Sequence, residues 1–142
     1  MRISAELLDE VIAHAREDPA NEVCGLVAVE AGPPAGGGAR TAVGVYRARN
    51  IHASPLKFEI EPAELLALSN AIEERGWEIG AIYHSHVRSD PYPSQTDINF
   101  AARWPGVEWI IVGLASREEP LVRSYLIEEG RVQELAIPEA AM

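Results

Sequence analysis

The feature that most restricts the fold is a mostly apolar segment, residues 77–83, that ends at the triplet His84-Ser85-His86. Its aromatic and β-branched residues are typical of a β-strand, and Gly76 before it is typical of the end of a helix. A loop with two prolines, residues 88–93, follows the triplet and turns the chain. We therefore predict a helix that leads into a strand, with two histidines where this strand ends.

Helices and strands are also predicted on both sides of this segment. Apolar residues at helical spacing, together with an N-cap at Ser4 and a first-turn proline at Pro62, predict helices over residues 4–17, 62–75 and 94–103. The apolar face of the second helix is predicted to consist of Leu65, Leu66, Leu68, Ala71 and Ile72. Apolar runs bounded by turn residues predict strands over residues 23–30, 41–48, 108–115 and 121–128, and a last one ending near residue 137.

Two connections have a distinct composition. Residues 31–39, rich in glycine and proline, are expected to form an exposed hairpin connection, and residues 58–60 a short extended piece. Strands with helices between them indicate an α/β (α+β) fold with a single mixed β-sheet flanked by helices. A chain of 142 residues is too short for two ordinary domains, so we expect a single domain over residues 1–142.

The charge of the chain excludes some partners. The 22 acidic and 12 basic side chains give a formal net charge of −10, which would repel both nucleic acid and an anionic membrane surface. No apolar run approaches the roughly 20 residues that a membrane span needs. A lone cysteine, Cys24, fits a reducing compartment, and its apolar neighbours favour a buried residue over a nucleophile. We expect a cytoplasmic protein that binds neither nucleic acid nor membranes.

The triplet suggests a metal site. Side chains alternate along a strand, so His84 and His86 point the same way with Cβ atoms about 7 Å apart, close enough to bind one ion. Asp97 follows the proline loop and can return to the histidines as a third ligand. Two histidines and one carboxylate leave a position for water, as in catalytic zinc sites, whereas structural zinc sites would use more cysteines.

A simpler interpretation remains open on these residues. His84 and His86 could be ordinary histidines near a strand end, while Ser94 and Asp97 have the spacing of a helix capping box. The two interpretations compete, because an Asp97 bound to a metal is not expected to be fully engaged in reciprocal capping of Ser94. Residue spacing alone does not decide between them.

A resemblance to a known family favours the metal. The JAMM/MPN+ metalloproteases carry a glutamate near the first strand, then His-Ser/Thr-His, seven residues, Ser, two residues and Asp. This chain has Glu22, the triplet His84-Ser85-His86, the intervening residues 87–93, Ser94 and Asp97 in the same order. The order of helices and strands also resembles this family over nearly the whole chain, which implies a cytidine-deaminase-like fold.

The resemblance implies a role for each motif residue. His84, His86 and Asp97 would bind one Zn²⁺ per chain together with a water molecule. Glu22 would act as the general base, and Ser94 would donate a hydrogen bond to the developing oxyanion. The reaction would be hydrolysis of a peptide or isopeptide bond without a covalent intermediate.

The resemblance is strongest to the compact bacterial branch, which is similar to the Mec CysO-cysteine peptidase of actinobacteria. It is carried by residues 22–25, Asn50, Ser54-Pro55, residues 83–86 and residues 92–94. The resemblance implies that the substrate and partner is a ubiquitin-like sulfur-carrier protein with a Gly-Gly tail. The released product would be an amino acid, with cysteine as the first candidate, or a short peptide. We expect this tail to extend along an edge strand, with residues 58–60 and 87–93 as candidate walls. The sequence leaves open whether the protein forms a homodimer.

Three alternatives belong to other functional classes. A non-catalytic MPN scaffold would have lost metal ligands, whereas this chain keeps every motif position. A DNA-linked protein of the related RadC type shares the His-x-His and Asp pattern but conflicts with the charge of −10. A metal-dependent hydrolase of a small amide without a protein partner remains compatible with the same residues.

Overall fold

The computed structural model describes residues 1–34, 36–115 and 118–137. Residue 35 of the predicted hairpin connection and the last residues of the predicted domain, 138–142, lie outside the described part of the chain. Within the described residues, three helices and six strands follow one another in the order α1 (Ala5–Glu17), β1 (Cys24–Glu30), β2 (Ala42–Ala48), α2 (Pro62–Glu74), β3 (Trp77–His86), α3 (Gln95–Ala101), β4 (Glu108–Gly113), β5 (Leu121–Glu128) and β6 (Arg131–Leu135).

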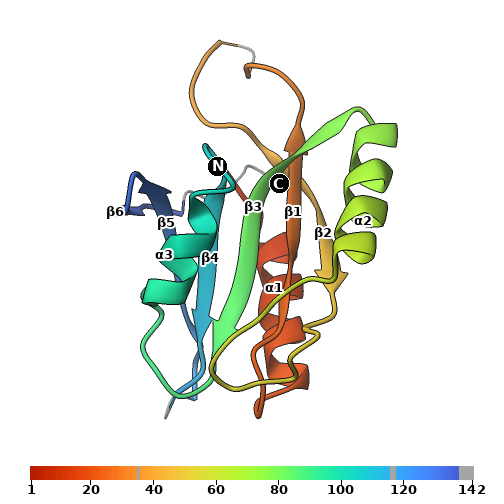
Figure 1. Ribbon diagram of the computed structural model, residues 1–142. Coiled ribbons are helices and arrows are strands. Elements are labelled where there is room, and N and C mark those ends of the chain that lie inside the picture. The colour runs from red at the N-terminus through yellow and green to blue at the C-terminus, as the bar shows by residue number, and fades with distance from the viewer. Residues whose placement is uncertain (35, 116–117, 138–142) are drawn as a thin grey trace.

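All six strands belong to one mixed sheet in the order β2-β1-β3-β4-β5-β6, as Figure 1 shows. β3 and β4 are parallel and are joined through α3, whereas the other neighbouring strands are antiparallel. A parallel pair needs a crossover connection of this kind. β3 therefore lies inside the sheet, and His84 pairs with Cys24 of β1 and with Ile111 of β4. The predicted α/β class with a single mixed sheet is confirmed.

Helices cover both faces of the sheet (Figure 1). On one face, Val11 and Ala15 of α1 pack with Val27 of β1 and Ala81 of β3. On the other face, Ile72 of α2 and residues of α3 pack on the alternate strand residues, among them Leu26, Ile82 and Trp109. Because side chains alternate along a strand, consecutive residues of β3 enter different cores. His84 is buried on the face covered by α2 and α3, against Phe58 and Trp109 of that core.

The predicted helix boundaries are close to those observed. The Ser4 hydroxyl accepts a hydrogen bond from the Leu7 N–H at 3.2 Å, and Gly76 follows α2 with a φ of 78°. α3 is shorter than predicted, because it begins after Ser94 and ends at Ala101.

Among the predicted strands, β3 extends through both histidines, while β4 and β6 end earlier, at Gly113 and Leu135. In the predicted extended piece, Ile60 forms an isolated bridge with Asn50.

The prediction for the apolar face of α2 was partly wrong. Ile72 is buried and Leu65 and Leu68 pack on the core, but Leu66 is 62% exposed and Ala71 is also exposed. Residues 65, 68 and 72 follow one side of a helix with 3.6 residues per turn, whereas residue 66 is rotated by about 100° from residue 65. Hydrophobicity alone assigned Leu66 to the wrong side.

The structure also bears on the predicted burial of Cys24 and on the length of apolar helices. Cys24 is fully buried in β1, and burial raises the pKa of its thiol to about 12, so it is a core residue as predicted. Within residues 1–34, 36–115 and 118–137, no helix is both long and apolar enough to cross a membrane.

Candidate metal centre

The motif residues come together from three parts of the chain at one end of the sheet. His84 and His86 lie at the end of β3, Asp97 lies in the first turn of α3, and Glu22 lies just before β1. His84, His86, Asp97 and Glu22 are 0%, 4%, 4% and 6% exposed, respectively. Burying four titratable side chains so close together is costly unless they are paired or bind an ion. The arrangement therefore calls for a chemical explanation beyond packing.

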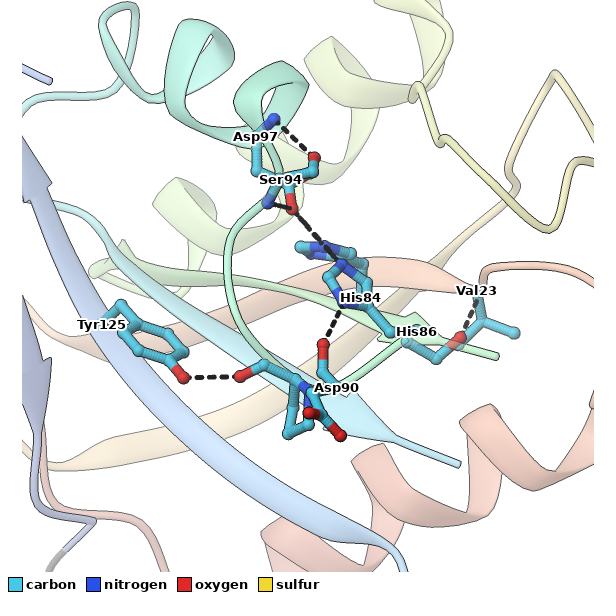
Figure 2. Close-up of polar contacts among 9 residues, drawn as sticks. Val23, His84, His86, Asp90, Ser94, Asp97 and Tyr125 are labelled. Atoms are coloured by element: carbon cyan, nitrogen blue, oxygen red, sulfur yellow. Dashed lines mark hydrogen bonds and ion pairs between the residues drawn. The ribbon is translucent and has the colours of Figure 1, made fainter. Parts of the chain in front are cut away.

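Three ligand-type atoms converge at this point, as Figure 2 shows. The Nε2 atoms of His84 and His86 are 3.1 Å apart. The Oδ2 atom of Asp97 lies 3.1 Å from His84 Nε2 and 3.3 Å from His86 Nε2. Glu22 joins them, because its carboxylate lies within 4.8 Å of a ring nitrogen of each histidine.

These separations fit a zinc ion. Ligand atoms that bind zinc tetrahedrally at about 2.0–2.1 Å lie about 3.3 Å from one another. The three separations of 3.1, 3.1 and 3.3 Å are close to this value. Imidazole nitrogens and a carboxylate oxygen are also zinc ligands by type. Asp97 Oδ2 thus has the spacing of a direct ligand beside the histidines, and Glu22 can also form a metal-holding group with them, because one ligand atom from each of Glu22, His84 and His86 lies within 4.8 Å of the others.

The two histidine rings are held in different ways. His86 Nδ1 donates to the Asp90 carbonyl at 2.8 Å, which leaves its Nε2 free to bind a metal (Figure 2). His84 Nδ1 is buried and has no hydrogen-bond partner among the described residues. Packing orients this ring instead: Phe58 stacks on it with ring centroids 4.5 Å apart, and Trp109 meets it edge-on at 6.2 Å.

Asp97 is both a helix cap and a neighbour of the histidines. Its Oδ2 accepts from the Ser94 N–H at 2.9 Å, and its own N–H donates to the Ser94 hydroxyl at 3.1 Å, which completes the capping box. The same Oδ2 faces both histidines. The capping box itself is therefore observed, and the expectation that a metal-bound Asp97 is not fully engaged in it stays a prediction. A carboxylate oxygen has more than one lone pair, so it can accept from a backbone N–H and still face the histidines.

Ser94 itself is exposed at the rim of the centre. Its oxygen accepts the Asp97 N–H, but a hydroxyl has a hydrogen of its own that stays available to a ligand. The predicted donor position is therefore compatible with the cap.

The two acidic side chains have opposite pKa shifts. Burial raises the pKa of Glu22 to about 8; the nearby Asp97 adds to this effect and His86 opposes it. Burial also acts to raise the pKa of Asp97, but the charge and hydrogen bonds of the histidines and the hydrogen bond from Ser94 outweigh it and hold that pKa well below its usual range. Without a metal, Glu22 thus keeps its proton at neutral pH while Asp97 is ionised.

The two histidines also differ. Burial lowers the pKa of His84, and the Asp97 carboxylate only partly opposes this, so the ring is neutral, as a metal ligand must be. Burial acts to lower the pKa of His86 too, but its hydrogen bonds with Asp97 and the Asp90 carbonyl prevail and raise it. Metal binding needs the Nε2 of His86 without a proton, so it competes with protonation of this ring.

Three residues around the centre were missed as supports by sequence reasoning. Phe58 was predicted only as a candidate wall, but it is buried and stacks on His84, so packing explains it. The Tyr125 hydroxyl donates to the Pro91 carbonyl at 2.5 Å and so supports the loop that carries Asp90, as Figure 2 shows. Asn50, which appeared only within the family resemblance, binds the Glu22 carbonyl at 3.0 Å.

An open groove adjoins the centre on the Glu22 side. It runs between the end of α1 and the end of β2, and its walls include His14, Glu22, Arg47 and Asn50. β2 is an edge strand of the sheet. A substrate could therefore reach Glu22 along this side.

Comparison with known proteins gives consistent matches. The family model described as prokaryotic homologs of the JAB domain matches residues 4–128. A desampylase of Haloferax volcanii is 36% identical over 116 residues, which are 78% of this chain and 78% of that protein. A CysO-cysteine peptidase of Mycobacterium bovis is 31% identical over 132 residues, 93% of this chain and 86% of that protein. A probable TtuB-protein conjugate cleaving protease of Thermus thermophilus is 36% identical over 132 residues, 92% and 77% of the two chains.

Solved structures agree on the fold. The solution structure of protein DSY2949 from Desulfitobacterium hafniense matches with a TM-score of 0.84 at 28% identity and covers 99% of this chain and 93% of that chain. A JAMM structure described as a metalloprotease-like zinc site in the proteasome and signalosome matches with a TM-score of 0.58 at 18% identity, over 99% and 98% of the two chains. At that identity the second match supports the fold alone.

Proposed function

Because this chain belongs to the prokaryotic JAB family of JAMM/MPN+ metalloproteases, we propose that it hydrolyses the amide bond after the C-terminal Gly-Gly of a small ubiquitin-like sulfur-carrier protein. The chain is a metallopeptidase that acts on peptide or isopeptide bonds. The proposed product is a free amino acid, with cysteine as the first candidate, or a short peptide. The names of the relatives support this substrate class, since they act on CysO-cysteine and on TtuB-protein conjugates.

The observation that carries the proposal is the convergence of His84 Nε2, His86 Nε2 and Asp97 Oδ2 at 3.1–3.3 Å, with the Glu22 carboxylate beside them. We assign the first three as ligands of one Zn²⁺ and Glu22 as the general base. When bound, zinc would polarise the scissile carbonyl, lower the pKa of water to about 7 and, as a cation, lower the pKa of Glu22.

Glu22 then moves the proton. Its carboxylate takes a proton from the attacking water, whose oxygen forms a bond to the carbonyl carbon. The same carboxyl delivers that proton to the leaving nitrogen as the C–N bond breaks, so one residue serves as base and then as acid. Its position in a buried pocket at the mouth of an open groove suits this role, because the leaving group can depart into the groove.

Ser94 stabilises the charge that develops on the carbonyl oxygen. Its hydroxyl hydrogen remains available while its oxygen accepts the Asp97 N–H. One donor of this kind typically contributes about 3 kcal/mol in the transition state. Gly-Gly suits the site because a chain without side chains can approach the buried histidines closely.

A mass-spectrometric assay tests the substrate. The enzyme is incubated with a carrier-Cys conjugate, a carrier joined to a lysine by an isopeptide bond, and a small Gly-Gly amide without a carrier. We expect the carrier conjugates to be cleaved at the Gly-Gly end, and a chelator to stop the reaction. Faster cleavage of the small amide than of either conjugate would instead establish a hydrolase without a protein partner.

Other expectations stay predictions. These are the single domain over residues 1–142, the cytoplasmic location and the exclusion of nucleic acid as a partner. The homodimer that the sequence left open gains no support from the names of the relatives.

A further inference from the structure

One asparagine outside the motif uses its whole hydrogen-bonding capacity beside the centre. The Nδ2 of Asn50 donates to the Glu22 carbonyl at 3.0 Å and to the Lys57 carbonyl at 2.9 Å. Its Oδ1 accepts from the His52 N–H at 3.1 Å and from the Glu59 N–H at 3.2 Å. A side-chain amide offers two N–H donors and two acceptor lone pairs, so all four positions of Asn50 are filled. Each partner is a main-chain group of a different residue.

The loop that Asn50 organises, residues 49–61 between β2 and α2, also holds the backbone of Glu22. The Glu22 N–H donates to the Ser54 carbonyl at 2.8 Å, while the Glu22 carbonyl accepts from Asn50. Glu22 precedes β1 and so has no place in the regular strand pairing. This loop, and not the sheet, therefore supplies both of these hydrogen-bond partners of the proposed base.

The same loop orients His84. Phe58 stacks on the His84 ring, whose Nδ1 has no hydrogen-bond partner among the described residues. The residues on both sides of Phe58 are the ones bound by Asn50, through the Lys57 carbonyl and the Glu59 N–H. Asn50 thus fixes the main chain around Phe58, and Phe58 fixes the ring.

We propose that Asn50 is a positioning residue of the hydrolytic centre, which sets the place of the Glu22 carboxyl relative to the His84 ring by binding the main chain on both sides. This inference rests on the proposed function, because it takes Glu22 as the base. In this role Asn50 acts through main-chain groups and not on the metal or the scissile bond. Misplacing a reacting group by about 1 Å can cost about 100-fold in rate, so one side chain of this kind can matter.

The most informative variant is Asn50→Asp, which has nearly the same shape. It keeps an oxygen that can accept from His52 and Glu59 but replaces the two donors by an oxygen facing the carbonyls of Glu22 and Lys57. We expect kcat to fall about 10- to 100-fold with KM changed less than about threefold, because the base is displaced while the substrate contacts remain.

The matched control is His52→Ala in the same loop. It removes the exposed ion pair of His52 Nε2 with Glu59 at 3.0 Å but leaves the main-chain N–H that Asn50 binds. We expect kcat within about twofold of wild type, since the hydrogen bonds that hold the main chain of Glu22 are intact. An equal loss of kcat in both variants would mean that any loosening of the loop is enough, and would overturn the specific role of Asn50.

A double-mutant cycle separates positioning from general destabilisation. If Asn50 acts largely through Glu22, Asn50→Asp should lower the residual turnover of Glu22→Gln by a clearly smaller factor than it lowers wild-type turnover. If Asn50→Asp lowers turnover by the same factor in wild type and in Glu22→Gln, the proposal is contradicted. Full activity of Glu22→Gln alone would instead remove Glu22 as the base, which is a failure of the proposed function and a different result.

A readout that needs no activity completes the test. In the metal-free protein, NMR signals of the histidine rings should shift for His84 in Asn50→Asp, because Phe58 is released, and stay in place for His86, which the Asp90 carbonyl holds. Unchanged His84 signals would overturn the link through Phe58. This measurement decides that link even if the carrier conjugate turns out not to be the substrate.

Discussion

The proposed metal ligands and the proposed base are positioned by different kinds of structure. His84, His86 and Asp97 lie on one short piece of chain, and two of them have local supports: the Asp90 carbonyl for His86 and the capping box for Asp97. Glu22 is far away in the sequence, and its backbone is held by Asn50 and Ser54 from another part of the chain. His86 and Asp97 thus depend on local supports, whereas the His84 ring and the backbone of Glu22 depend on tertiary contacts.

The carboxyl groups of Asp97 and Glu22 also differ in charge. Asp97 is ionised by its neighbours, whereas burial keeps Glu22 protonated in the absence of metal. Two carboxyls in one centre with pKa values moved in opposite directions are suited to different tasks, one as a permanent anion and one as a group that exchanges protons. The centre would therefore combine a preformed set of proposed ligands with a proposed base whose charge depends on what is bound.

Removing a ligand should have the largest effect. We expect His84→Ala to lose bound zinc and to lower turnover by at least about 1,000-fold, because metal-ion catalysis supplies several kcal/mol of stabilisation. Elemental analysis of protein purified without chelator should find about one zinc in wild type and in the exposed-histidine control His52→Ala. Full activity of metal-free wild type would rule out the metal as a participant.

Replacing the proposed base should lower turnover without removing the metal. We expect Glu22→Gln to lower kcat by about 100- to 10,000-fold while zinc content stays near that of wild type. The reason is that Asp97 Oδ2 lies 3.1 and 3.3 Å from the two histidine nitrogens, so these three groups can hold the ion without Glu22. Turnover and metal content measured on the same sample check this, and loss of zinc in Glu22→Gln would make Glu22 a ligand.

Ser94 belongs to both the cap and the proposed reaction. We expect Ser94→Ala to lower kcat by about 100-fold, with a smaller change in KM, and to cost about 1 kcal/mol of unfolding free energy through the lost cap. Thr96→Ala, at an exposed position in the same first turn, is the control. Steady-state kinetics and urea unfolding give both values, and a loss confined to stability would leave Ser94 as a helix cap alone.

The opposite pKa shifts predict the smallest effect, on the stability of the metal-free protein. The folded-state pKa of Glu22 is raised to about 8, so its contribution to stability is present below its ordinary value of 4.5 and is lost as the pH rises to about 8. The pKa of Asp97 is lowered, so its contribution is lost instead as the pH falls.

We expect Glu22→Gln to remove much of the loss of unfolding free energy that wild type shows between pH 5 and pH 8, measured by urea unfolding after chelation. Asp97→Asn should change only the acidic side of the profile. A Glu22→Gln profile parallel to that of wild type between these pH values would show that Glu22 does not keep its proton in the folded protein.

Much of the local structure could be predicted from residue types. Ser4 as N-cap, Gly76 after a helix, the capping box from Ser94 to Asp97 and two histidines on one side of a strand are all observed. Each depends on residues within a few positions of one another, where backbone geometry fixes which groups meet. Leu66 shows the limit, because its hydrophobicity suggested the buried side of α2 while its angular position exposed it.

What the sequence by itself determined is the proposed ligand set: a strand that alternates His84 and His86 and a helix start that returns Asp97, all within one local segment. Only the tertiary structure decided how Glu22 is held, that Phe58 packs on His84, and that Asp97 can cap and face the histidines at once. The physical reason is that Asn50 binds main-chain groups. Every residue carries such groups, so residue type does not reveal which of them the fold will bring together.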